Sequence, residues 1–516
     1  MHPRPSVLFA ALAATACAAP LFAQAAAPVP PEVAAAANVI TVEDARARLE
    51  FLSSDLMRGR DTPSPELNIV ASYLVSNYRA MGFQPAGENG GFMQWYPFPL
   101  RRISAAQTRM EVAGGAAPVS LALNRDFYAI GGTRQAFSGP LVYVGRAPDA
   151  AMGEGSLRGR IAVAALPGAS TRNWRIERNR IRGAAQRAGA AGVVYVLGPE
   201  WTADSVAKYG ALAARPSRTV GTELPYPQFY LSQEAAGRIF GAARQDLARQ
   251  WTAGAQASFR PLPLSGLTAT AGIPVEQVDE ARAPNVIAVW PGSDPVLRNE
   301  YVVLSAHMDH VGVGEPVNGD SIYNGADDDG SGTTGILEVA RAFASMGIRP
   351  KRSIVFLHVS GEEKGLLGSE WYSEHPTLPL AQTVANINID MIGRNHPDSV
   401  VVIGKNYSTL GATANAVQRA HPELHLTLAD DPWPQERFFF RSDHFHFARK
   451  EVPAIFFFSG THADYHRPSD HADKIDYDKL TRIARMAFFT AWEVANAPER
   501  PKWDPAGLAE VRGMTR

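Results

Sequence analysis

Four short segments of the chain each lead into residue types that bind metal ions. Three are apolar runs of strand length, at 301–306, 353–360 and 384–389, and histidine or acidic residues follow each run. The fourth is a glycine-rich turn, 324–326, that runs into three aspartates. Ligand sites of open α/β sheets lie outside the carboxyl ends of the strands, so the spacing predicts one shared site. With one residue from further along the chain, its candidates are His307, Asp328, Glu363, Asp390 and His466.

The chemistry of this residue set fits divalent metal ions. Two ions about 3.5–4 Å apart need a bridging carboxylate and roughly two further protein ligands each, which the five residues supply. Imidazole and carboxylate ligands without thiolate suit zinc in an open catalytic site. Asp309 is placed to accept the second ring N–H of His307. Glu362 would point the opposite way from Glu363 along an extended chain, so it is the candidate base that faces water.

Each piece alone has a simpler interpretation. A His-x-Asp pair or a Glu-Glu pair is usually surface polarity or a solvated turn, and Asp327–Asp329 could cap the helix that follows. The spacing from Asp327 to Glu338 also fits the calcium loop of an EF-hand. No helix is expected before that loop, Thr334 stands where an apolar residue is usual, and no second loop is found. Calcium is therefore disfavoured.

Strand-like and helical patterns alternate around these residues. The apolar run 285–290 starts a series of strand–helix units, with amphipathic helices expected after Gly332, after Gly365 and near the C-terminus. Two more helices are expected within 41–52 and 64–82. This alternation predicts an α/β domain with a doubly wound, mixed, mostly parallel sheet flanked by helices.

The segment 130–260 differs from its surroundings. Short β-like runs alternate with turns there, and no cluster of acidic residues and histidines occurs. We interpret it as an inserted, non-catalytic, β-rich module, which leaves 26–129 and 261–516 to form the catalytic domain. Its basic run, 172–187, is typical of a solvated helix face, and the formal net charge of −1 predicts no nucleic-acid partner.

Residues 1–25 have the pattern of a secretory signal peptide. Arg4 supplies a positive charge, residues 6–19 are apolar but too few to span a bilayer, and small residues precede a cleavage site after Ala25. Cleavage would leave a periplasmic or secreted chain with no cysteine and no membrane span. Lipid anchoring through Cys17 is the alternative, although the residues before it match a lipoprotein motif poorly.

Five ordered motifs give a specific resemblance. They are SAHMDH at 305–310, GADDDGSG at 325–332, SGEEKGLLGS at 360–369, NIDMIG at 388–393 and the pair Tyr465-His466. Together they resemble the co-catalytic zinc aminopeptidase family, which also contains glutamate carboxypeptidase, the glutaminyl cyclases and the transferrin receptor. The resemblance extends over most of the chain, and the inserted segment resembles a protease-associated domain.

The resemblance implies a role for each candidate ligand. His307 and Asp390 would bind one zinc ion, and Glu363 and His466 would bind the other. Asp328 would bridge the two ions, and a cis peptide bond would follow it. The implied cofactor is therefore two zinc ions per chain.

Three more residues have implied roles in the reaction. Glu362 would be the general base and then the acid toward the leaving amine. Tyr465 would help to hold the oxyanion of the tetrahedral intermediate. Arg441 lies in a segment that resembles one beside the substrate in some aminopeptidases, and an ordinary loop salt bridge is the alternative for it.

These roles predict an exported di-zinc exopeptidase with peptide substrates, an aminopeptidase that releases N-terminal residues. A carboxypeptidase or dipeptidase of the same family is the nearest alternative, because the preference for a chain end depends on loops. A glutaminyl cyclase is less favoured because that branch uses a single metal ion. An inactive binding homologue is less favoured because no ligand is missing. The sequence gives no indication of an oligomeric state.

Overall fold

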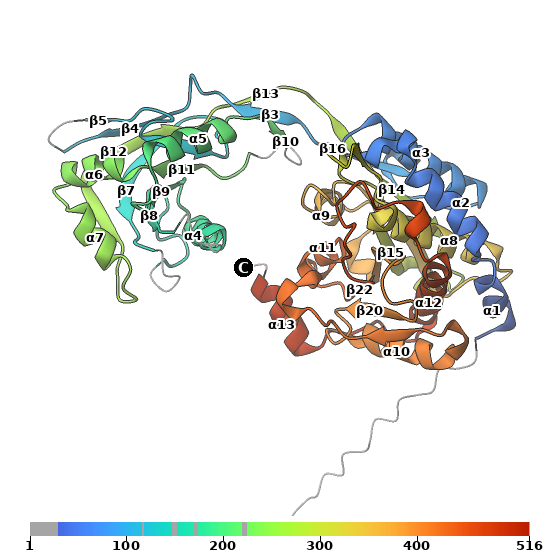
Figure 1. Cartoon of the computed structure of the whole chain (residues 1–516). Coiled ribbons are helices and arrows are strands. Elements are labelled where there is room, and N and C mark those ends of the chain that lie inside the picture. The colour runs from blue at the N-terminus through green and yellow to red at the C-terminus, as the bar shows by residue number, and fades with distance from the viewer. Residues whose placement is uncertain (1–28, 116–117, 147–151, 169–173, 219–223, 515–516) are drawn as a thin grey trace, which may run out of the picture.

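The computed structural model describes residues 29–115, 118–146, 152–168, 174–218 and 224–514 (Figure 1). Two large mixed sheets organise the chain, and a small three-stranded sheet lies where one leads into the other. The signal peptide expected at the N-terminus, with Cys17, falls outside the described residues. Among the helices that the structure describes, none is long and apolar enough to cross a membrane.

The larger sheet has nine strands, in the order β1-β14-β18-β15-β19-β22-β20-β21, and β2 also pairs with β14. Its centre, from β18 through β15 and β19 to β22, is parallel. β14 and β20 pair antiparallel on either side of this centre, and β21 is parallel to β20. The expected mixed α/β sheet is confirmed. Its strands are β1 (Gln84–Pro85), β2 (Met93–Pro97), β14 (Arg282–Trp290), β15 (Tyr301–His307), β18 (Ser353–Val359), β19 (Thr383–Ile389), β20 (Ser399–Ile403), β21 (Thr427–Ala429) and β22 (Ala454–Phe458).

Helices cover both faces of this sheet. Successive side chains of a buried strand point to opposite faces, so apolar side chains of each strand pack on both sides of the sheet. In β15, Val302 and Leu304 pack in the core that includes α1, α2, α3, α8, α10 and α12. Val303, between them, packs in the core on the side of α9 and α11. The helices of this part of the chain are α1 (Pro31–Ala37), α2 (Val42–Leu52), α3 (Pro65–Ala80), α8 (Gly332–Ser345), α9 (Leu367–Glu374), α10 (Thr409–Ala420), α11 (His444–Arg449), α12 (Tyr477–Asn496) and α13 (Pro505–Met514).

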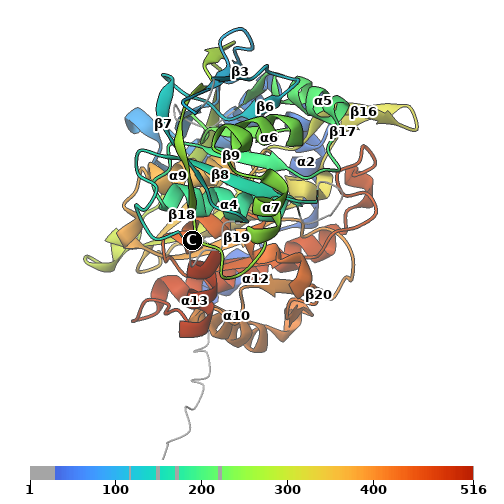
Figure 2. The same cartoon turned by 90° about the vertical axis from the view of Figure 1, so that its left-hand side faces the viewer.

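The second sheet has eight strands, in the order β5-β4-β12-β7-β8-β9-β11-β6 (Figure 2). It takes strands from Arg109 to Gly272, so it extends past both bounds of the segment expected as an insert, 130–260. Residues of β4 are alternately exposed and buried. β12 lies between β4 and β7 and pairs antiparallel with both. A likeness to a protease-associated domain stays a prediction. The elements are β4 (Arg109–Ala113), β5 (Val119–Ser120), β6 (Phe127–Ile130), β7 (Phe137–Tyr143), β8 (Ile161–Leu166), α4 (Trp174–Arg187), β9 (Val193–Leu197), α5 (Ala203–Ala213), β11 (Gln228–Leu231), α6 (Gln233–Ala242), α7 (Leu247–Ala253) and β12 (Leu262–Gly272).

The three-stranded sheet holds the entrance and the exit of the second sheet together. β3 (Leu100–Ile103) leads into the second sheet, β13 (Val275–Gln277) leads out of it, and the two pair antiparallel. β10 (Ser217–Arg218) pairs with the other side of β3. Just beyond the β3–β13 pair, the Ser104 N–H donates to the Pro274 carbonyl at 2.8 Å.

Replacing residues 105–273 with a short turn is expected to leave the nine-stranded sheet folded. Because Ser104 and Pro274 are already hydrogen-bonded neighbours, such a turn closes a β3–β13 hairpin. Circular dichroism and thermal unfolding of the variant should show a single cooperative transition.

Deleting only residues 130–260 is the matched control. This change keeps β4 and β12 but removes the strands and helices that cover Val112 and Ala269. We expect that variant to aggregate, because it exposes an apolar sheet face. A soluble 105–273 deletion that unfolds without a cooperative transition would contradict the prediction.

Candidate metal centre

The carboxyl ends of the parallel strands bring the five candidate ligands together. β15 ends at His307, Asp390 follows β19 directly, and Glu363 follows β18 after a short turn. Asp328 lies in the turn before α8, and His466 lies in the loop after β22. This is the edge where ligand sites of open α/β sheets form.

Asp328 lies between two histidines and faces them with different oxygens. Its Oδ1 is 3.2 Å from His307 Nε2, and its Oδ2 is 3.0 Å from His466 Nε2. Burial alone would raise the pKa of this carboxyl, but the contacts with His307 and His466 outweigh it and hold the pKa well below its usual range. The Asp328 carboxylate thus contacts both His307 and His466. The peptide bond from Asp328 to Asp329 is cis, as the resemblance implies.

The other two candidates complete two groups around Asp328. On one side, Asp390 Oδ1 lies 3.7 Å from His307 Nε2. On the other side, Glu363 Oε2 lies 3.0 Å from His466 Nε2. The structure therefore pairs His307 with Asp390 and Glu363 with His466, the division that the resemblance implies.

Several buried polar atoms of these residues have no hydrogen-bond partner among the described residues. A buried carboxylate without a partner costs several kcal/mol, and a cation between the ligands would satisfy these atoms. Carboxylate and imidazole donors in an open site suit zinc. The atoms are Asp328 Oδ2, Asp390 Oδ1 and His466 Nε2.

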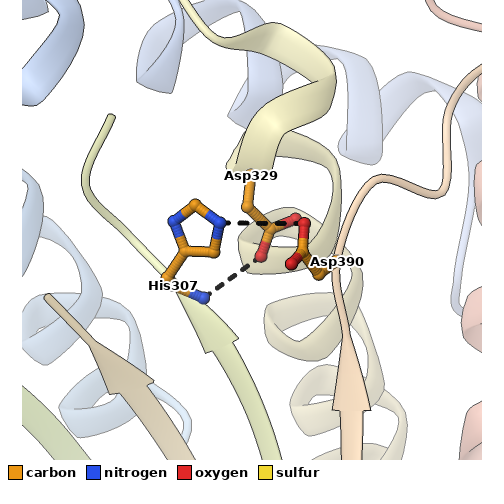
Figure 3. Close-up of side chains that lie close together, drawn as sticks. All are labelled: His307, Asp329 and Asp390. Carbon is orange, nitrogen blue, oxygen red and sulfur yellow. Dashed lines mark hydrogen bonds and ion pairs between the residues drawn. The ribbon is translucent and has the colours of Figure 1, made fainter. Parts of the chain in front are cut away.

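Asp329 holds the framework around His307 and Asp390 (Figure 3). Its Oδ2 accepts the His307 backbone N–H at 3.1 Å, and its Oδ1 accepts those of Gly332 at 2.8 Å and Met391 at 3.2 Å. One carboxylate thus ties together the end of β15, the start of α8 and the turn after Asp390. The bond to Gly332 satisfies the first backbone N–H of α8, whose N-cap residue is Ser331. The tie to His307 had no signal in the sequence.

Asp309 holds His307 differently from the expectation. Its carboxylate Oδ1 is 3.6 Å from His307 Nδ1, whereas its backbone oxygen is closer, at 3.2 Å. The carboxylate instead accepts the Thr62 hydroxyl at 2.8 Å and the Gly361 N–H at 2.7 Å, with the Glu362 N–H at 3.3 Å. Asp309 therefore anchors the turn that carries Glu362.

Glu362 lines a pocket beside the candidate ligands. Its Oε2 is 4.0 Å from His307 Nε2. Burial raises the pKa of Glu362 well above its usual value; His307 opposes this rise, and the charge of Asp443 adds to it. A carboxyl with a raised pKa in a cleft is typical of a group that accepts and returns a proton. The lining residues are His307, Asp328, Glu362, Asp390, Met391, Phe438, Arg441, Phe456, Phe458, Thr461 and Tyr465.

Tyr465 and Arg441 both lie at this pocket. The Tyr465 ring stacks on the His466 ring, with centroids 3.9 Å apart. The Arg441 guanidinium lies 4.8 Å from the centre of the Phe438 ring and donates to Glu436 at 3.3 Å, and its side chain is 45% exposed. Arg441 therefore lines the pocket and also forms the loop salt bridge given as its alternative.

The region that carries this geometry matches a known family. Residues 285–491 match the sequence model of Peptidase family M28. This part of the chain is a family M28 domain. All five candidate ligands and Glu362 lie within it.

The curated relatives of this chain include proteins named as an aminopeptidase and as a leupeptin-inactivating enzyme. Leupeptin-inactivating enzyme 1 of Streptomyces exfoliatus is 31% identical over 196 residues, 37% of this chain and 38% of that protein. Probable leucine aminopeptidase 2 of Aspergillus fumigatus is 31% identical over 202 residues, 38% of this chain and 37% of that protein. The chain thus spans well under two thirds of the length of these relatives. Among solved structures, the aminopeptidase from Aneurinibacillus sp. strain AM-1 aligns with 92% of this chain and 98% of its own, at 20% identity and a TM-score of 0.48.

Arg60 supports the M28 site from a distant part of the sequence. It is 1% exposed, and its guanidinium donates to the carbonyls of Asn324 at 2.5 Å, Gly325 at 2.6 Å and Asp328 at 3.1 Å. It is thus a buried cation directly behind Asp328. An arginine 268 residues before Asp328 in the chain gives no sequence signal of this contact.

Replacing Arg60 with methionine is expected to destabilise the protein by about 3–5 kcal/mol, because the change leaves buried acidic groups without their cation and carbonyls without their donors. Denaturant unfolding measures the loss. Arg58→Met is the control: Arg58 is 59% exposed and only 3.7 Å from Glu66, so we expect a change within about 1 kcal/mol. Equal stability of the two variants would contradict the role of Arg60.

Proposed function

We propose that this protein is an exported di-zinc aminopeptidase that releases N-terminal residues from peptides. The observation that carries the proposal is the position of Asp328 between two His–carboxylate groups, with Glu362 at the pocket beside them. The M28 domain and the name of the leucine aminopeptidase relative support a peptidase, and the buried histidine and carboxylate groups suit zinc. The signal-like pattern of residues 1–25 supports export.

The roles of the chain's residues follow from their places around the pocket. His307, Asp390 and Asp328 would hold one zinc ion, and Glu363, His466 and Asp328 the other. When bound, the zinc pair supplies positive charge that polarises a carbonyl and makes water more acidic.

Glu362 and Tyr465 would carry the proton and hold the developing charge. Glu362 takes a proton from the attacking water and returns it to the leaving nitrogen. Tyr465, whose pKa is raised by burial and by Asp328, keeps its O–H and donates it to the oxyanion.

The pocket favours a peptide with a free amino terminus and an apolar first residue. The carboxylates of Asp390 and Glu362 both line it and can bind an ammonium group. Met391, Phe438 and Phe456 form an apolar part of its wall, which suits an apolar side chain. A glutaminyl cyclase is less well supported, because the five ligands serve two metal ions.

Acetylating the N-terminus of a short peptide that begins with leucine is expected to lower kcat/KM by about 30-fold or more. The reason is that loss of one partner from a buried charge contact costs about 2–5 kcal/mol. The same peptide with an amidated C-terminus is the matched control and should be cleaved at a similar rate. If amidation stops the reaction and acetylation does not, the enzyme is a carboxypeptidase. If both stop it, the enzyme is a dipeptidase.

A further inference from the structure

A buried histidine beside the candidate ligands has no part in the roles given above. His310 follows Asp309, and its side chain is fully buried. Its Nδ1 lies 2.7 Å from Glu363 Oε1 and 3.8 Å from Asp328 Oδ2. The imidazole therefore reaches the half of the site that Glu363 and His466 form.

The surrounding backbone holds the ring of His310 in place. Gly325, at a φ of 59°, lies directly against it: a Cβ added at Gly325 would be 2.4 Å from His310 Cγ. The His310 backbone N–H donates to the Arg60 carbonyl at 3.3 Å. Arg60 in turn donates to the Gly325 carbonyl at 2.6 Å. The ring is thus fixed between two segments and keeps Nδ1 against Glu363.

The two oxygens of Glu363 face different histidines. Oε2 is 3.0 Å from His466 Nε2, and Oε1 is 2.7 Å from His310 Nδ1. A histidine nitrogen and a carboxylate oxygen that bind the same tetrahedral zinc ion lie about 3.3 Å apart, since each atom is about 2.0–2.1 Å from the ion. The 2.7 Å separation at His310 is shorter than this and is that of a close imidazole–carboxylate contact. Carboxylates that bind metals are commonly held by such contacts, which fix the oxygen that faces the ion.

We propose that His310 is a positioning residue for the metal ion held by Glu363 and His466. The His310 Nδ1–H holds Glu363 Oε1, so that Oε2 faces the ion. The inference rests on the proposed zinc pair. It predicts that loss of the imidazole weakens the binding of the zinc ion at Glu363 and His466 and leaves the binding of the ion at His307 and Asp390 unchanged.

Three substitutions of His310 separate positioning from packing and from direct ligation. The side-chain nitrogen of asparagine occupies the place of Nδ1, and that of glutamine the place of Nε2. Phenylalanine keeps the ring without a donor. We expect His310→Phe and His310→Gln to raise the zinc dissociation constant of one site by about 10–100-fold, and His310→Asn to remain close to wild type. The measurement is a zinc titration of metal-free protein against a chelator of known affinity, with thermal unfolding of each variant.

His358→Asn is the control for loss of a buried histidine. His358 is also fully buried, but its Nε2 lies 2.7 Å from the Tyr78 hydroxyl. This variant should unfold at a lower temperature and keep both zinc affinities. If His310→Phe does not fold, His310→Gln carries the test.

Three outcomes would overturn the inference. If His310→Asn binds zinc as weakly as His310→Phe does, His310 is a direct ligand or has a packing role. An equal loss of zinc affinity at both sites would indicate a general loss of structure. Unchanged affinities would show that His310 does not act on the site. Wild-type protein that binds no zinc would overturn the proposed function itself, which the same titration detects first.

Discussion

Replacing Glu362 with glutamine is expected to lower kcat by about 10²–10⁴-fold, the usual effect of removing a positioned general base. Glutamine keeps the size and hydrogen-bonding reach of glutamate but cannot accept a proton at neutral pH. Zinc content should stay at the wild-type value, because Glu362 lies 4.0 Å from His307 and lines the pocket. Substrate affinity should change only slightly.

Glu363→Gln is the matched control, because the two glutamates are adjacent and chemically alike. Glu363 lies 3.0 Å from His466 and does not belong to the pocket lining. Its loss should lower zinc content together with activity. Elemental analysis and steady-state kinetics on the same two samples measure both quantities. If Glu362→Gln loses zinc and Glu363→Gln keeps it, the roles are reversed; if Glu362→Gln keeps near-normal turnover, Glu362 is not the base.

The sequence predicted that the candidate ligands lie at one edge of the sheet, because strand ends carry a local signal. An apolar run of strand length followed by histidine or acid is visible in one stretch of sequence, as at His307 and Asp390. Parallel strands then place these ends at one edge of the sheet. The mixed α/β sheet with helices on both faces follows from the same alternation.

Contacts made by distant segments could not be predicted in this way. Arg60 and His310 both contact the backbone around Gly325, and these contacts exist only once η1 (Asp55–Arg60) packs against the loop before α8. Asp309 was expected to accept the second ring N–H of His307, but its carboxylate instead accepts hydrogen bonds from Thr62 and Gly361. Spacing along the chain predicts neighbours, whereas hydrogen-bond partners depend on the packed structure.

The bounds of the second sheet were also beyond the local pattern. β4 shows clear alternation of exposed and buried residues, but this pattern also suits an edge strand of the main sheet. Only its pairing with β12 places β4 in the second sheet. The sheet to which a strand belongs depends on partners far apart in the sequence. The change of sequence pattern near residue 130 therefore lies after Arg109, where the strands of the second sheet begin.

Removing the metal is expected to abolish the activity, because the buried carboxylates and imidazoles have no other way to polarise a peptide carbonyl. Protein treated with a chelator and then freed from it should release no leucine from a peptide with a free N-terminus. Magnesium and calcium should not restore the reaction, since histidine ligands favour zinc over these ions.

The most direct test of the zinc aminopeptidase account is to add zinc back to this metal-free protein while N-terminal leucine release and bound metal are measured on the same sample. The account predicts that the rate returns to its original value as bound zinc approaches about two ions per chain. Full leucine release by protein with no bound metal would contradict it.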